Sequence, residues 1–247
     1  MKSILRSLTL ALLSCIVAST TQATTITWTN TAGGNWNASA NWNPNQVPGA
    51  SDTAIITTSG TYQVTVSDNE SVSNLVLGAT GGTLTLSIVN GTFTVNGTGS
   101  DHDQSVLAVS GGTLAGTGTI AVGGPLNWTS GTITDTVQCN GGSINVSSSS
   151  GLNSGGTLIN LGNLTWTPNG GPRTGGGTVI SNAFSGVISV TLNGNNIDSY
   201  VYGGAAAFYN AGVINVSGAG QSGFITDPFF NSGTVNINGG TLAVTGG

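Results

Sequence analysis

The chain has 247 residues, of which only 4% are charged and 41 are Gly. Soluble domains average about 25% charged residues and about 7% Gly, so the composition argues against helices held by ion pairs. Nucleic-acid binding is not expected, because three Lys and Arg residues cannot neutralise a row of phosphates. The hydrophobic fraction of 37% argues against disorder and favours an uncharged, Gly-rich β-protein.

Residues 1–23 have the features of a secretory signal peptide. Lys2 and Arg6 precede a short apolar run, and Thr21-Gln22-Ala23 is a small-residue cleavage site. The run is shorter than the roughly 20 apolar residues of a membrane span, so we expect a secreted protein without a transmembrane span after cleavage. An alternative is a lipid anchor on Cys15, which we rank lower because the preceding Leu13 fits a lipobox poorly.

Cleavage leaves one cation and one cysteine in the chain. Arg173 then stands against eight acidic residues, so the mature protein is acidic. Cys139 has no partner for an internal disulfide, and we expect it to be a small buried apolar residue. The alternative, a reactive thiol, needs an activating cation or His nearby, and these are scarce in this sequence.

Residues 24–60 form a Trp-rich segment that we expect to cap the N-terminus of the fold. Trp36 and Trp42 lie among several Asn residues. Two interpretations are open. The rings cover the open end of the first repeat, as solenoids require, or they are exposed and stack on the faces of sugars. We favour the cap.

Short alternating strands separated by Gly-rich turns follow from residue 61 to residue 247. Apolar and polar residues alternate in Tyr62–Val66 and in Leu84–Ile88, which is typical of half-buried strands. The tetrapeptide Gly-Gly-Thr-Leu occurs at 81–84, 111–114, 155–158 and 239–242. Such self-similarity indicates one structural unit stacked on its neighbour.

A second repeat places Asn at a regular position near the end of a strand, and it includes Asn160, Asn182, Asn210 and Asn231. The spacing predicts an all-β fold in which a single-stranded parallel β-helix makes roughly ten coils of about 21 residues. A β-sandwich also fits short strands and frequent turns, but it does not explain the repeat.

The Asn repeat predicts a ladder of stacked side chains. We expect Asn210 and Asn231 to occupy equivalent inward-facing corners of successive coils, with their amides bonded to each other or to the turn backbone. The aromatic residues that precede them are expected to stack between coils. Replacing Asn231 by Leu should then cost about 1–3 kcal/mol, whereas Asn193→Leu should be nearly neutral.

Four runs, 126–133, 157–166, 208–212 and 229–235, resemble the large secreted repeat proteins of bacteria, such as autotransporter passengers and filamentous-haemagglutinin-like proteins. The resemblance implies a right-handed β-helix displayed outside the cell. We expect surface glycans or matrix as partners of the chain. Because the repeat stops in mid-unit at Gly247, we expect the chain to be a fragment of a longer surface protein.

The sequence contains few residues that could act in catalysis. Polysaccharide lyases that share the β-helix use a cationic base beside acidic residues, and here Arg173 has no Asp or Glu near it in sequence. The triplet Asp101-His102-Asp103 places its side chains on opposite faces of a strand, and Asp68 with Glu70 is more typical of a turn. We therefore expect a non-catalytic structural or adhesin-type protein with no catalytic residue, cofactor or metal. The alternatives are a polysaccharide-active enzyme and a carbohydrate-binding module.

Overall fold

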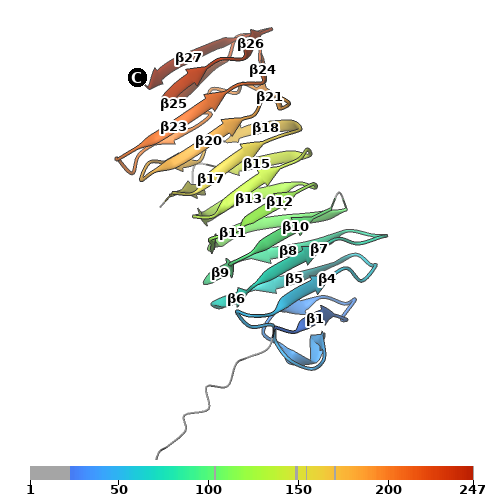
Figure 1. Ribbon diagram of the computed structural model, residues 1–247. Coiled ribbons are helices and arrows are strands. Elements are labelled where there is room, and N and C mark those ends of the chain that lie inside the picture. The colour runs from blue at the N-terminus through green and yellow to red at the C-terminus, as the bar shows by residue number, and fades with distance from the viewer. Residues whose placement is uncertain (1–22, 103, 148–149, 154, 170, 247) are drawn as a thin grey trace, which may run out of the picture.

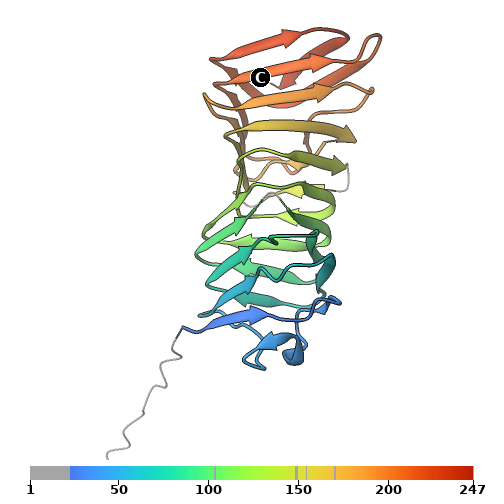
Figure 2. The same ribbon diagram turned by 90° about the vertical axis from the view of Figure 1, so that its right-hand side faces the viewer.

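The computed structural model describes residues 23–102, 104–147, 150–153, 155–169 and 171–246, which form an elongated stack of coils (Figures 1 and 2). Within these ranges the chain is built from strands, with a single 3-10 turn, η1, at Ser39–Asn41. No helix in the described part of the chain has the length and apolar character to cross a membrane. The predicted signal peptide, apart from Ala23, and the alternative lipid site at Cys15 lie outside the described residues.

A 12-stranded sheet forms one side of the stack. Its strands, in chain order, are β1 (Thr25–Trp28), β3 (Trp42–Asn43), β4 (Thr53–Ile56), β7 (Asn74–Leu77), β10 (Thr98–Asp101), β12 (Thr119–Val122), β14 (Thr136–Cys139), β17 (Thr157–Asn160), β20 (Thr178–Asn182), β23 (Ala206–Asn210), β25 (Ser222–Asn231) and β27 (Thr241–Gly246). Every neighbouring pair is parallel except β1 with β3.

A 15-stranded sheet bends around the other two sides. Its strands are β2 (Gly34–Asn35), β5 (Tyr62–Val66), β6 (Glu70–Val72), β8 (Leu84–Ile88), β9 (Thr92–Val95), β11 (Ser105–Gly116), β13 (Leu126–Ile133), β15 (Ser143–Ser147), β16 (Ser150–Leu152), β18 (Asn163–Asn169), β19 (Arg173–Thr174), β21 (Val187–Thr191), β22 (Ser199–Tyr200), β24 (Val213–Ser217) and β26 (Thr234–Ile237). The long strand β11 pairs with β8 in its first half and with β9 in its second, so this strand continues through the bend between the two sides.

The predicted parallel β-helix is confirmed. The sheets stack as a β-solenoid of about 9 turns with a spacing near 21 residues, close to the predicted ten coils. The four Gly-Gly-Thr-Leu copies, however, do not stack on one another. Leu84 begins a strand in the 15-stranded sheet, whereas Leu158 lies in the 12-stranded sheet and pairs with Ile180. The copy at 111–114 lies wholly inside β11, so the tetrapeptide marks neither one fixed corner of the coil nor always a turn.

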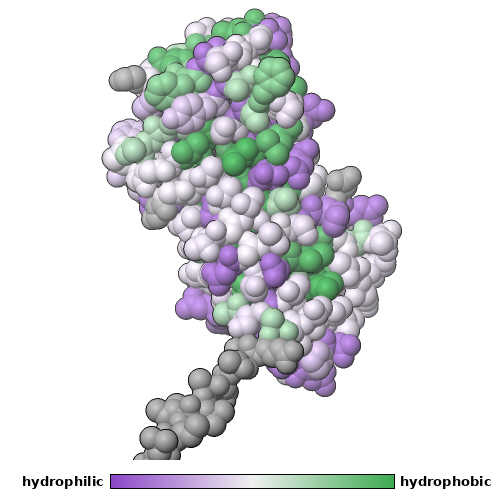
Figure 3. Space-filling model, viewed as in Figure 1, coloured by the Kyte–Doolittle hydropathy of each residue, from purple (hydrophilic) through white to green (hydrophobic). Residues whose placement is uncertain are grey.

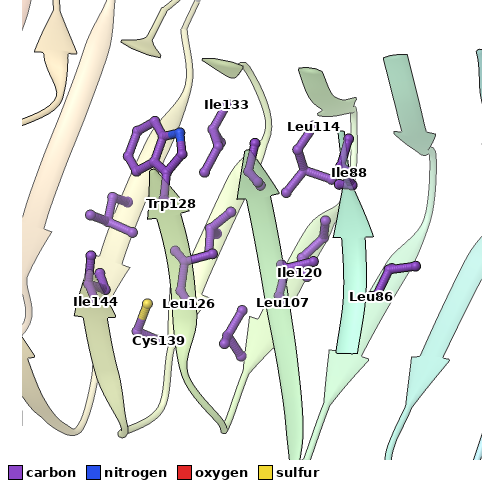
Figure 4. Close-up of a cluster of buried hydrophobic side chains, with 14 of the residues drawn as sticks. Leu86, Ile88, Leu107, Leu114, Ile120, Leu126, Trp128, Ile133, Cys139 and Ile144 are labelled. Atoms are coloured by element: carbon purple, nitrogen blue, oxygen red, sulfur yellow. The ribbon is translucent and has the colours of Figure 1, made fainter. Parts of the chain in front are cut away.

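The core is a set of apolar columns inside the coils. Alternation along each strand points every second side chain inward, and parallel pairing places like residues above one another. Leu107, Leu126 and Ile144 form one such column in register, and Figure 4 shows them with Trp128 and Cys139. Full burial of an aliphatic side chain stabilises the fold by about 1.5–3 kcal/mol, so the columns hold the coils together.

A Trp cluster closes the N-terminal end of the stack. The rings of Trp28 and Trp42 meet edge to face at 5.0 Å, and Trp36 contacts both Trp42 and Phe93 at 4.7 and 4.9 Å. The antiparallel strand β3 runs back along β1, so residues 29–43 cover the first coil. Because β1 also pairs in parallel with β4, the solenoid itself already begins within 24–60.

Candidate functional site

The asparagine ladder runs along the inside of one corner of the C-terminal coils. Asn160, Asn182, Asn210 and Asn231 are paired in register in successive strands of the 12-stranded sheet. Each Nδ2 donates to the Oδ1 of the next Asn, at 2.8, 2.7 and 2.7 Å along the ladder. The steps are 22, 28 and 21 residues, so the ladder tolerates insertions between coils.

The amides of Asn160, Asn182 and Asn210 also bind the backbone of the next coil just after its corner. Asn182 donates to the carbonyl of Val213 at 3.1 Å, and Asn210 donates to that of Thr234 at 3.3 Å. A Gly follows at the corner because the coils approach too closely for a side chain. A Cβ on Gly212 would lie only 2.2 Å from the carbonyl oxygen of Gly186. The ladder therefore fixes both the register and the path of the corner.

Asn231 differs from the expectation, whereas Cys139, in the same column, is buried as expected. Asn231 pairs with Asn210 as predicted in register, but its side chain is exposed and does not face a buried interior. On the other side of the ladder the column continues with Cys139, which pairs with Asn160. Cys139 is fully buried, and burial raises the pKa of its thiol to about 12, with the charge of Asp101 adding to the effect.

The glycan-stacking interpretation of Trp36 and Trp42 is wrong. Each side chain is only 1% exposed, because the rings pack on one another and on Phe93 inside the cap. The indole N–H of Trp42 donates to the backbone carbonyl of Trp36 at 2.7 Å, so this N–H is not available to a sugar hydroxyl. A sugar has no access to either ring face.

Exposed aromatic residues occur instead near the ladder corner, on the outside of the C-terminal coils. Most of the hydrophobic surface visible in Figure 3 lies over these coils. The corner after β20 spans residues 183–186, whereas the corners after β17, β23 and β25 have two residues each. This insertion projects Phe184, which is 90% exposed. Water contacts nearly the whole ring, an unfavourable position for an unpartnered Phe.

Two adjoining shallow hollows lie at the ladder corner and share Ala211 and Ser232. One, of about 400 Å³, extends from Phe184 to these two residues. The other, of about 470 Å³, is lined by Tyr209 and Phe230. We call Phe184, Tyr209, Ala211, Phe230 and Ser232 the corner patch. Every residue that lines the two hollows, within the described ranges, is uncharged.

The rings of Tyr209 and Phe230 form a step of the predicted aromatic stack. They lie on successive coils with centroids 5.1 Å apart and planes 20° apart, and they remain 45% and 53% exposed. Phe208 and Phe229, on the inward face, meet at 5.5 Å with perpendicular planes. Alternation along β23 and β25 thus places one aromatic pair inside and one outside.

Two buried carboxyls lie inside the same coils. Three donors converge on Oδ1 of Asp198, namely the hydroxyl and N–H of Thr226 and the N–H of Asp227. Oδ1 of Asp227 accepts from the hydroxyl of Thr174 at 2.6 Å. Burial and the charge of Asp198 raise the pKa of Asp227 to about 6, and burial also raises the pKa of Asp198. Sequence analysis could not have found this pair, because neither Asp is at a repeated position.

The remaining candidates lie apart from one another. His102 is exposed in a turn while Asp101 points into the interior, as the alternation predicts, and Asp103 lies outside the described residues. Asp68 accepts a hydrogen bond from Asn37 at 2.7 Å. The guanidinium of Arg173 lies 5.6 Å from the centre of the Tyr202 ring.

Neither protein-family models nor curated proteins nor solved structures gave a match to this chain.

Proposed function

We propose that this chain is a secreted, non-catalytic β-solenoid that acts at the cell surface as an adhesin-type binding rod. In this proposal it works like the autotransporter passengers and filamentous-haemagglutinin-like proteins that its repeats resemble. The coils supply length and rigidity, and the corner patch supplies the contact with a partner.

The exposed ring of Phe184 is the observation that carries the proposal. A solenoid corner needs only two residues here, as its neighbours after β17 and β23 demonstrate. The longer corner at 183–186 adds an apolar ring to the surface and contributes nothing to the core. Exposed apolar groups that gather beside hollows are typical of interaction sites.

The placement of the reactive groups supports a role without catalysis. Asp198, Asp227 and Cys139 are buried inside the coils, where a substrate cannot reach them. The cation that a lyase mechanism needs, Arg173, lies against the ring of Tyr202. These groups are therefore poorly placed to act on a substrate, and the apolar area of the corner patch is better suited to binding. Localisation outside the cell follows from the predicted signal peptide over residues 1–23.

Adhesion of coated beads tests this function. Fluorescent beads carrying the chain are applied to epithelial cell layers and to bacterial biofilm, and bound beads are counted after washing. We expect adhesion above that of albumin-coated beads on at least one surface, and lower adhesion for Phe184→Ala. Adhesion equal to that of albumin on both surfaces, or unchanged by Phe184→Ala, would contradict the proposal.

A further inference from the structure

The corner patch spans three successive coils. Phe184, Ala211 and Ser232 each come shortly after a ladder residue, and those residues, Asn182, Asn210 and Asn231, are paired in register. Adjacent strands of a sheet lie about 4.8 Å apart, so the surface repeats at that interval. A pyranose unit in an extended polysaccharide advances by about the same length. The patch thus suits a linear ligand whose repeat matches the coil.

The corner patch is lined by uncharged residues, which favours a neutral ligand. Uncharged residues line both hollows within the described chain, and the acidic residues of the nearby coils, Asp198 and Asp227, are buried. An anionic ligand finds no cation here, and the acidic balance of the whole chain repels it. A basic ligand finds no surface carboxylate to pair with among the residues that line the hollows.

The patch combines apolar rings with hydrogen-bonding groups, as the surface of a sugar does. The ring of Phe184 is free on its surface, and sugars present C–H faces that pack on such rings. Beside the rings, the Oδ1 of Asn231 already accepts from Asn210, so its NH₂ group is left to donate to a hydroxyl. The hydroxyls of Ser232 and Tyr209 are exposed at the same surface.

We propose that the corner patch binds an uncharged polysaccharide, laid along the coil axis across Phe184 and the Tyr209–Phe230 step. This inference rests on the proposed binding function and names its ligand class. A protein partner is the competing occupant, and the experiment below distinguishes the two.

Retention on insoluble polysaccharides tests the inference. The full chain is incubated with cellulose, chitin and β-1,3-glucan as neutral probes, and with cross-linked alginate and polygalacturonate as acidic probes. We expect retention on at least one neutral probe and none on the acidic probes. Phe184→Ala should weaken that retention about tenfold, since a ring stacking contact is lost, while Phe184→Trp should preserve it.

Val201→Ala is the matched control, because Val201 is an exposed apolar residue outside the patch. It should bind like the unchanged chain, and circular dichroism should be the same for all variants. Retention on no neutral probe, equal retention on acidic probes, or full retention by Phe184→Ala would each overturn the inference. If beads still adhere to cells through Phe184 while the neutral probes fail, the ligand class is wrong and the binding function stands. Adhesion that resists periodate but not protease treatment of the cells would identify a protein partner.

Discussion

The asparagine ladder is a device in which one residue type solves two problems at each corner. A corner leaves backbone carbonyls without a strand partner, and a buried polar group without a hydrogen bond costs about 1–3 kcal/mol. The Asn amide has two donors and one acceptor, so it serves the Asn of the next coil and a carbonyl such as that of Val213 together. No aliphatic side chain can replace it without loss.

Asn182→Leu should destabilise the protein more than any other ladder substitution. It would leave the buried Oδ1 of Asn210 and the carbonyl of Val213 without the donor that Asn182 supplies. It would also remove one of the acceptors of the Asn160 amide. We expect a loss of about 1–3 kcal/mol in the free energy of unfolding, measured by urea denaturation. Asn231→Leu should cost less than first expected, because the Asn231 side chain is exposed.

Asn145→Leu provides the control for that series. Asn145 also donates to an asparagine of the previous coil, Asn127, at 2.8 Å, but this pair is exposed on the surface. Water can replace the bond there, so the change in stability should be a few tenths of a kcal/mol. Equal losses for Asn182→Leu and Asn145→Leu would mean that the buried ladder contributes nothing specific.

Cys139 should be unreactive in the folded protein. Its thiol is fully buried, and its pKa is raised to about 12, so almost none is present as the nucleophilic thiolate. We expect no alkylation of Cys139 by iodoacetamide near pH 8 in the native state and complete alkylation in denaturant, as read by peptide mass spectrometry. Rapid native labelling would show that this part of the core opens.

At this scale the sequence predicts recurring residues well and singular residues poorly. The four ladder asparagines could be identified because each returns at the same place in a strand. The burial of Trp36 agrees with the cap that the sequence favoured. The exposure of Asn231 depends on which element covers it, and the local sequence does not contain that information. Three of the ladder asparagines are followed two residues later by Gly, whereas Asn182 is followed there by Phe184. This difference acquires a meaning only when the structure shows that the position is a corner.

At the scale of the coil, the strands explain why the acidic residues are inside. Asp135 and Asp227 stand at buried positions in or beside strands, so their carboxyls lose water on folding. Burial raises the pKa of each from 3.8 to about 6. The folded chain therefore binds protons more tightly than the unfolded chain, and folding is coupled to pH.

The protein should be more stable in mild acid than at neutral pH. For these carboxyls the stabilisation is fully present below the unfolded pKa of 3.8 and is lost as pH rises through about 6. We expect a higher Tm at about pH 5 than at about pH 8, measured by scanning calorimetry. Asp135→Asn and Asp227→Asn should each flatten this dependence, because an amide does not titrate. A Tm that rises with pH over the same range would contradict the assignment.

The coil also shows what strand patterns determine. Alternation and β-branched residues predicted strands at Tyr62–Val66 and Leu84–Ile88, and both form with those bounds. The tetrapeptide Gly-Gly-Thr-Leu did not predict a position in the coil, because its copies occur at strands of both sheets and one copy lies inside β11. The Asn column, which hydrogen-bonds across coils, was the better guide to register.

At the scale of the whole molecule, the solenoid has almost only nearest-neighbour contacts between coils. A perturbation in such a fold spreads to adjacent coils and weakens with distance, in contrast to a globular core. The N-terminal end is closed by the Trp cluster, and the ladder supports the C-terminal coils. The two ends should therefore behave as separate regions of stability.

Trp42→Ala and Asn182→Leu should loosen opposite ends of the rod. Removing the Trp42 ring leaves a cavity against Trp28 and Trp36, which costs about 3–5 kcal/mol in a packed core. Hydrogen exchange should then accelerate in β1, β4 and β7 and stay unchanged in β23 and β25. Asn182→Leu should give the reverse pattern. Uniform acceleration along the chain in either variant would mean that the rod unfolds as one cooperative unit, because local loosening cannot raise exchange in distant coils.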